Sequence, residues 1–113
     1  MQPNAVLLVV CNTPDADTAR KIAEALIERR LAACVNILAP CQSVYRWQGA
    51  VEDSSEVPLL IKTTAARYGA LEAAISAIHP YEVPEIIALP VSHGLPDYMS
   101  WVLAETSPLD AGH

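Results

Sequence analysis

Phenylalanine is absent from the 113 residues of this sequence. Hydrophobic residues nevertheless make up 52% of the chain, and many of them are alanine. The core is therefore predicted to consist of leucine, isoleucine, valine and alanine side chains, which allow helices to pack closely on a sheet. Internal repeats, low-complexity tracts and linkers are also lacking. A chain of this length supports one domain, residues 1–113, with one core.

Basic residues are in the minority. The sequence has 7 lysines and arginines against 13 aspartates and glutamates, which gives a net charge of -6. A surface of this sign repels phosphate backbones and anionic lipids, which argues against nucleic-acid binding and against docking on membranes. An acidic surface attracts cations only diffusely, so the charge by itself predicts no metal site.

Paired cysteines and long apolar segments are missing as well. The three cysteines, Cys11, Cys34 and Cys41, form no CxxC motif, which excludes a zinc ribbon and a thioredoxin motif. Their odd number and wide spacing fit free thiols in a reducing compartment. Residues 1–10 lack the basic region and cleavage site of a signal peptide, and the apolar runs are too short to span a bilayer. We therefore expect a cytoplasmic protein.

The first part of the chain predicts a strand followed by a helix. Residues 5–11 form a continuous apolar run, which is typical of a strand buried on both faces. Thr13 is a suitable N-cap, and Pro14 suits the first position of a helix. The apolar side of that helix is predicted from a periodic set of residues: Ala19, Ile22, Ala23, Leu26 and Ile27.

The middle of the chain predicts an antiparallel hairpin. Its extended segments are residues 31–38, 43–51 and 57–63. Pro40 interrupts the first arm, because proline cannot donate a hydrogen bond to a neighbouring strand. The four polar residues 52–55 predict a turn between the arms. We expect a long hairpin that bends at Pro40.

The last part predicts a helix, an edge strand and a short final helix. Thr64 is expected to cap a helix over residues 65–78, which Pro80 ends. Prolines at both ends of residues 83–89 place the strand there at a sheet edge or a bulge. A short C-terminal helix is predicted from three spaced apolar residues: Leu95, Tyr98 and Val102.

The predicted element order is β-α-β-β-α-β with a final helix. That order specifies an α+β, ferredoxin-like fold, in which an antiparallel sheet carries its helices on one face. Valine, isoleucine and leucine dominate both faces of the predicted strands, so the second face of the sheet would expose apolar surface. The sequence therefore favours an oligomer in which sheets bury one another.

Five segments in a fixed order resemble the CutA divalent-cation tolerance family. They are LAACVN at 31–36, SVYRWQG at 43–49, EVPLLIKTT at 56–64, HPYEVPE at 79–85 and DYMSW at 97–101. The resemblance extends over about residues 5–105 and implies the ferredoxin-like fold reached above. It also implies a tight homotrimer with edge strands paired between subunits, and a function in tolerance of copper and other divalent metals. P-II-type signalling proteins share this trimer architecture, which suggests small-molecule sensing by analogy only.

The resemblance suggests Cys34 and His79 as metal ligands. Thiolate and imidazole both bind copper, and thiolate favours Cu(I). Cys11 is a third candidate, because it ends a strand near a helix N-terminus, a position that lowers the pKa of a thiol. The alternatives are that both cysteines are buried and inert, and that His79 hydrogen-bonds the last carbonyls of its helix. Copper or another divalent metal is the expected cofactor, and folding is not expected to require it.

A second group of residues predicts a ligand cleft between subunits: Tyr45, Trp47, Lys62, Tyr81 and Glu85. A lysine with a carboxylate and aromatic walls suits a small anionic or zwitterionic ligand. The alternative is that these side chains pack in a subunit interface, where tryptophan and tyrosine are enriched.

The predicted function is binding of copper or a related ion by a homotrimer in the response to metal ions. No oxyanion hole, nucleophile elbow or phosphate loop is recognisable, so we expect no enzyme. One alternative is a P-II-like trimer that senses a small anionic metabolite through Lys62 and the cleft. Another is a structural or partner-binding trimer that binds metal incidentally. The expected partners are other copies of the chain and a metal ion, with no nucleic acid and no membrane.

Overall fold

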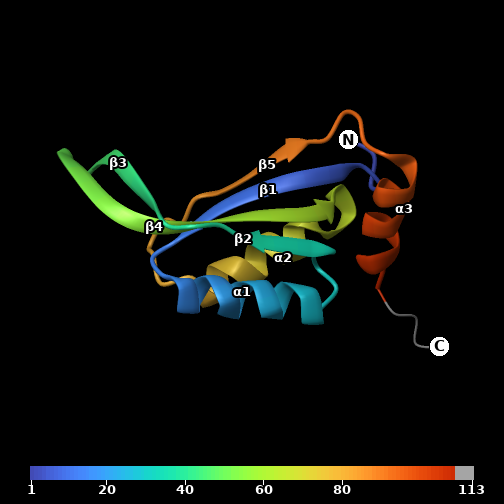
Figure 1. Ribbon diagram of the computed structural model, residues 1–113, viewed down its shortest axis with the longest axis horizontal. Coiled ribbons are helices and arrows are strands. Elements are labelled where there is room, and N and C mark those ends of the chain that lie inside the picture. The colour runs from blue at the N-terminus through green and yellow to red at the C-terminus, as the bar shows by residue number, and fades with distance from the viewer. Residues whose placement is uncertain (109–113) are drawn as a thin grey trace.

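The computed structural model describes residues 1–108 and places two helices on one face of an antiparallel sheet (Figure 1). The elements in chain order are β1 (Val6–Thr13), α1 (Ala16–Glu28), β2 (Cys34–Ile37), β3 (Cys41–Trp47), β4 (Ala50–Thr64), α2 (Ala65–Ile78), β5 (Ile86–Pro90) and α3 (Pro96–Glu105). The predicted α+β fold is confirmed. The predicted interruption at Pro40 is confirmed, because Pro40 lies between β2 and β3.

The strand order is β2-β4-β1-β5, and β3 pairs with the outer part of β4. All these pairs are antiparallel. β1 therefore lies between β4 and β5, and β5 forms an edge, as the prolines beside it predicted. Without β3, this is the strand order of a ferredoxin-like sheet.

The core lies between the sheet and the helices α1 and α2. Alternate residues of β1 and β4 face the helices, because successive side chains of a strand point to opposite faces. The fully buried core side chains larger than alanine are Val9, Cys11, Ile22, Leu26, Leu59, Ile61, Leu71 and Ile75. Burying one such leucine or isoleucine contributes about 1.5–3 kcal/mol. The predicted core without phenylalanine is confirmed.

The start of α1 differs from the prediction. Asp15 is the N-cap, and its carboxylate accepts a hydrogen bond of 2.7 Å from the Thr18 backbone N–H. Thr13 still belongs to β1, and its hydroxyl donates to the backbone oxygen of Val57 at 2.8 Å. The prediction of Thr13 as the cap was wrong because that hydroxyl already joins two strands.

The turn of the long hairpin also differs from the prediction. Residues 52–55 lie inside β4, and the turn is formed by Gln48 and Gly49. Their φ angles are +49° and +82°, and Trp47 pairs directly with Ala50. Two central residues with positive φ form a type I′ turn, whose twist suits a two-residue hairpin loop. Polarity alone misplaced the turn, because the outer part of β4 is exposed on both faces.

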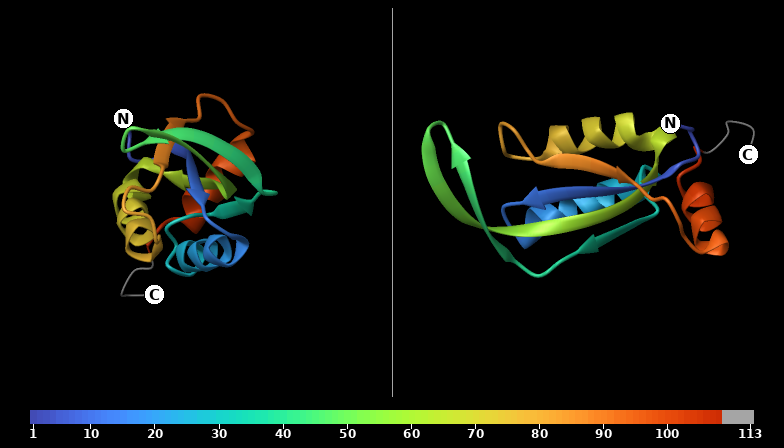
Figure 2. Two further views of the ribbon diagram at one scale, coloured as in Figure 1. Left: turned by 90° about the vertical axis from the view of Figure 1, so that its left-hand side faces the viewer. Right: turned by 90° about the horizontal axis from the view of Figure 1, so that it is seen from above.

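The hairpin of β3 and the outer part of β4 projects beyond the rest of the molecule (Figure 2). The molecule measures 51 × 30 × 24 Å, and its radius of gyration is 15.0 Å. A compact domain of this length would have a radius of gyration of about 13 Å. The projecting arm exposes large apolar side chains: Val44, Tyr45, Trp47 and Val51.

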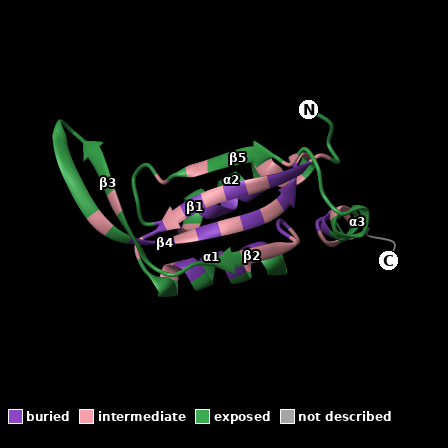
Figure 3. Cartoon of the chain, turned by 45° about the horizontal axis from the view of Figure 1, so that its top comes forward, coloured by how far each residue is buried: buried purple, intermediate pink, exposed green. Residues whose placement is uncertain are grey.

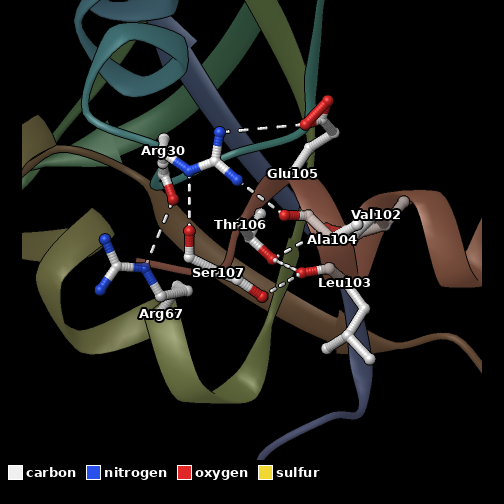
Figure 4. Close-up of polar contacts among 8 residues, drawn as sticks. All are labelled: Arg30, Arg67, Val102, Leu103, Ala104, Glu105, Thr106 and Ser107. Carbon is white, nitrogen blue, oxygen red and sulfur yellow. Dashed lines mark hydrogen bonds and ion pairs between the residues drawn. The ribbon is translucent and has the colours of Figure 1, made fainter. Parts of the chain in front are cut away.

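The C-terminal helix α3 is held at the other end of the sheet by Arg30 (Figure 4). The guanidinium donates hydrogen bonds of 2.7 Å each to the backbone oxygens of Ala104 and Ser107. The buried side chain of Val102 anchors the same helix. No helix within residues 1–108 combines the length and apolarity needed to cross a bilayer.

Candidate functional site

A cleft of about 650 Å³ lies where the projecting hairpin faces the segment between α2 and β5. Three aromatic residues line it: Tyr45 and Trp47 from β3, and Tyr81 from the segment after α2. In Figure 3 the hairpin beside it is coloured mostly as exposed. Glu85 also lines the cleft, so four of the five residues predicted to form a ligand cleft lie together. Lys62 is not among the lining residues.

Carboxylates dominate the polar lining of the cleft. Glu56 is only 7% exposed, and it accepts a hydrogen bond of 3.0 Å from the Tyr81 hydroxyl. Glu85 accepts a hydrogen bond of 3.2 Å from the side-chain amide of Asn12. Glu52 and Glu82 complete the acidic lining. Burial, followed by the hydrogen bond and negative charge of Glu56, raises the pKa of Tyr81 to about 12.

Lys62 lies instead on the sheet face turned away from α1 and α2, which we call the open face. It pairs with Cys34 across β4 and β2, and its Nζ lies 4.0 Å from the Cys34 Sγ. The same ammonium donates a hydrogen bond to the side-chain oxygen of Asn36. Cys34 is half-buried. The pKa of Tyr98 is raised, first by burial of the Tyr98 hydroxyl and then by the charge of nearby Cys34. Cys34 therefore belongs to a small polar group at the α3 end of the sheet.

His79 is buried, and both of its ring nitrogens are engaged. Its Nδ1 accepts a hydrogen bond of 3.2 Å from the Tyr81 backbone N–H. Its Nε2 therefore carries the hydrogen that is donated to the backbone oxygen of Asn12 at 2.7 Å. The imidazole contacts the Tyr81 ring in a tilted arrangement, with centroids 4.7 Å apart and an angle of 53° between the ring planes. In this arrangement His79 positions the segment that carries Tyr81, and neither nitrogen is free to bind a metal.

Cys11 is fully buried in the core. Burial, followed by the negative charges of Glu85 and Glu56, raises the pKa of its thiol to about 12. The expectation that a helix N-terminus lowers this pKa was wrong, because desolvation of the thiolate outweighs the helix dipole. A thiol in this state is a poor metal ligand, since metals bind the thiolate.

The three metal candidates do not converge on one point. Lys62, the partner of Cys34, pairs with Leu8 of β1, whereas His79 contacts Asn12 of the same strand. Four residues of extended chain span about 13 Å. Within residues 1–108, no three His, Cys, Asp or Glu side chains are grouped closely enough to hold a metal ion.

Of the four glutamates that line the cleft, Glu85 was predicted to do so, whereas Glu52, Glu56 and Glu82 were not. Glu52 was assigned to a turn, and Glu56 was noted only as part of a family segment. The Gln48-Gly49 pair was the available signal, because a two-residue turn there puts residues 50–56 in register with β3. That register carries Glu52 opposite Tyr45.

One known protein family matches most of this chain. A family model described as "CutA1 divalent ion tolerance protein" matches residues 7–105. The chain belongs to the CutA1 family. The predicted resemblance is thereby confirmed, and the five segments that carried it all fall within the matched residues.

Relatives of this chain include bacterial and animal proteins. The divalent-cation tolerance protein CutA of Thermus thermophilus is 46% identical over 99 residues, which cover 88% of this chain and 96% of the relative. Protein CutA of the mouse is 44% identical over 100 residues, but the chain spans only 56% of that protein. The CutA1 fold is also shared by the crystal structure of CutA from Xylella fastidiosa. It is 44% identical with a TM-score of 0.89, covering 91% of this chain and 99% of that one.

Proposed function

We propose that the chain acts in divalent-cation tolerance as a homotrimer that binds copper or a related ion, with Cys34 as its first ligand. Membership of the CutA1 family supports the general function. The placement of Cys34 carries the metal proposal. This thiol is half-buried on the open face, whereas Cys11 is sealed in the core and Cys41 lies on the projecting hairpin. A soft thiolate ligand favours Cu(I).

The open face supports the proposed association of subunits. Its apolar rows follow the strand register, with Leu8 beside Leu89 and Val10 beside Ile87. Ile87 is 53% exposed and Leu89 is 48% exposed, although both lie on a sheet. Contiguous apolar surface of this kind marks an interaction surface. β3 and β5 are also edge strands, whose unpaired backbone groups can accept a strand from another copy.

Association and metal binding are connected in this proposal. One chain brings no three ligands together within its described residues. A site built from three ligands among residues 1–108 therefore requires side chains from more than one copy. A threefold axis near Cys34 would supply one thiolate from each of three chains, which is a coordination that suits Cu(I).

The test is a competition titration of reduced, metal-free protein with Cu(I) against a chelator of known affinity. We expect one copper ion for every three chains, and we expect Cys34→Ser to abolish this uptake. Cys41→Ser is the matched control, because it removes an exposed thiol outside the proposed site. Weak uptake without fixed stoichiometry, unchanged in Cys34→Ser, would refute the metal site and favour a trimer that binds metal incidentally.

The oligomer is tested separately from the metal. A trimer that buries its open faces should have three times the mass of the chain in solution. Its unfolding midpoint should rise with protein concentration, because association stabilises only the folded chain. A monomer mass with a midpoint that is independent of concentration would contradict the proposed assembly.

A further inference from the structure

The acidic cleft contains a buried carboxylate without a cationic partner. Glu56 lines the cleft and is only 7% exposed. Its carboxylate accepts one hydrogen bond, from the neutral Tyr81 hydroxyl. The ion pairs found within residues 1–108 are Arg20–Glu24 and Arg30–Glu105, and neither involves the cleft. Buried carboxylates are rare unless they are paired with a cation. Among the described residues, the Glu56 carboxylate therefore has a neutral hydrogen-bond partner but no cationic one.

The charge of the cleft selects the sign of a ligand. Glu52, Glu82 and Glu85 line it together with Glu56, and no lysine, arginine or histidine among the described residues does so. The Tyr81 hydroxyl and the Asn12 amide, which donate to Glu56 and Glu85, are both neutral. Several negative charges around one confined space repel an anion and attract a cation. This cleft does not favour the anionic ligand expected from the sequence, because Lys62, which would bind the anion, does not line it.

The spacing of the carboxylates selects the size of the cation. A metal ion needs several ligands within about 2–2.6 Å of one point. Among the described residues no three acidic, cysteine or histidine side chains meet this condition. The four glutamates are instead distributed around a cleft of about 650 Å³. A cation that contacts several of them must be extended.

The walls of the cleft select the chemical character of that cation. Tyr45, Trp47 and Tyr81 supply aromatic faces, and Val44 and Val83 add aliphatic surface. Aromatic faces attract ammonium groups and also pack against methylene chains. A lining that combines carboxylates with apolar and aromatic side chains therefore matches a chain of ammonium groups joined by methylene segments.

We propose that this cleft binds a linear aliphatic polyammonium ion of the polyamine class. One ammonium group pairs with the Glu56 carboxylate beside the Tyr81 hydroxyl. The other ammonium groups pair with the exposed glutamates of the cleft: Glu52, Glu82 and Glu85. The methylene segments lie against the aromatic walls. This binding is independent of Cys34 and of copper.

The test uses spermidine as the probe and tryptophan fluorescence as the readout. In a Trp101→Phe background, Trp47 is the only tryptophan and reports on the cleft. We expect saturable binding of spermidine that is weakened at least about tenfold by Glu56→Gln, which removes one charged partner. Glu28→Gln is the matched control, because it removes an exposed carboxylate of α1 outside the cleft. Glu82→Gln, at an exposed position of the cleft, should weaken binding about threefold and serves if Glu56→Gln does not fold.

Several results would overturn the proposal. Equal affinity in the Glu56→Gln, Glu82→Gln and Glu28→Gln variants would mean that spermidine binds only to the acidic surface in general. Saturation by magnesium at similar concentrations, or by succinate, would contradict a site for an organic cation. A change of oligomer mass in Glu56→Gln without any spermidine binding to the parent protein would show that another copy supplies the missing cation. Copper binding through Cys34 should be unaffected in all of these variants.

Discussion

Replacing Arg30 tests two features that the structure combines at one residue. Its backbone has a φ of +57°, which is a left-handed conformation that side chains with a Cβ disfavour. Its guanidinium holds the last carbonyls of α3 through two hydrogen bonds of 2.7 Å (Figure 4). We compare Arg30→Ala, which loses the hydrogen bonds and keeps the strain, with Arg30→Gly, which loses both.

The magnitudes follow from exposure and conformation. The Arg30 side chain is 31% exposed, so its two charged hydrogen bonds contribute about 1–2 kcal/mol together after screening by solvent. A positive φ costs a residue with a Cβ about 1 kcal/mol more than glycine. We expect Arg30→Ala to lower the free energy of unfolding by about 1–2 kcal/mol. Arg30→Gly should be about 1 kcal/mol more stable than Arg30→Ala, although glycine usually destabilises a fold.

The assay is urea unfolding at one fixed protein concentration, so that any association affects all variants equally. Trp101 lies on α3 and reports on the helix that Arg30 holds. Arg30→Lys keeps the charge but cannot reproduce the planar fork, and it should fall between Arg30→Ala and the parent protein. Equal stability of the alanine and glycine variants would refute the conformational reasoning. Full stability of Arg30→Ala would refute the role of the guanidinium.

Three further predictions concern the turn, the thiols and alkaline pH. Gly49→Ala should destabilise the protein by about 1 kcal/mol in thermal unfolding, because Gly49 has a φ of +82°, and an unchanged midpoint would contradict the type I′ turn. Iodoacetamide at pH 8 should modify exposed Cys41 quickly and half-buried Cys34 more slowly. Buried Cys11, with its pKa raised to about 12, should react only after unfolding; mass spectrometry of labelled peptides would contradict this if Cys11 reacted first. The pKa of Tyr81 is raised to about 12, so the unfolded chain releases this proton near pH 10 while the folded chain retains it. The free energy of unfolding should therefore fall as the pH rises from about 10 to 12. Tyr81→Phe should make this fall smaller in urea unfolding across that range, and an identical fall in both proteins would show that Tyr81 is not its source.

The candidate residues were predicted with uneven success, for reasons that can be named. Tyr45, Trp47, Tyr81 and Glu85 lie together as expected, because the hairpin that carries the first two faces the segment between α2 and β5 that carries the others. Lys62, which was predicted with them, does not line this cleft within one chain. Its position on β4 places it about six residues from Glu56 along the strand, and at the opposite end of the sheet from the cleft.

Local chemistry determined most of the helix and strand positions. Residues 65–78 form α2 with the predicted ends, and Pro80 follows the helix. Thr64 occupies the N-cap position, but its side chain makes no capping hydrogen bond, so that part of the prediction was wrong. The ends of α1 and the hairpin turn were less predictable. Thr13 could serve either as a cap or in a strand, and only the backbone oxygen of Val57 decided between these roles.

The sequence by itself determined the fold class, the family and the composition of the core, because periodicity and segment order are properties of the chain. The tertiary structure decided the state of each functional side chain, because burial and partners depend on residues distant in sequence. It sealed Cys11 in the core, engaged both nitrogens of His79 and left Cys34 on the open face. It also places Glu56 of β4 against Tyr81, which follows α2, and so forms an acidic cleft that no local pattern of residues predicted.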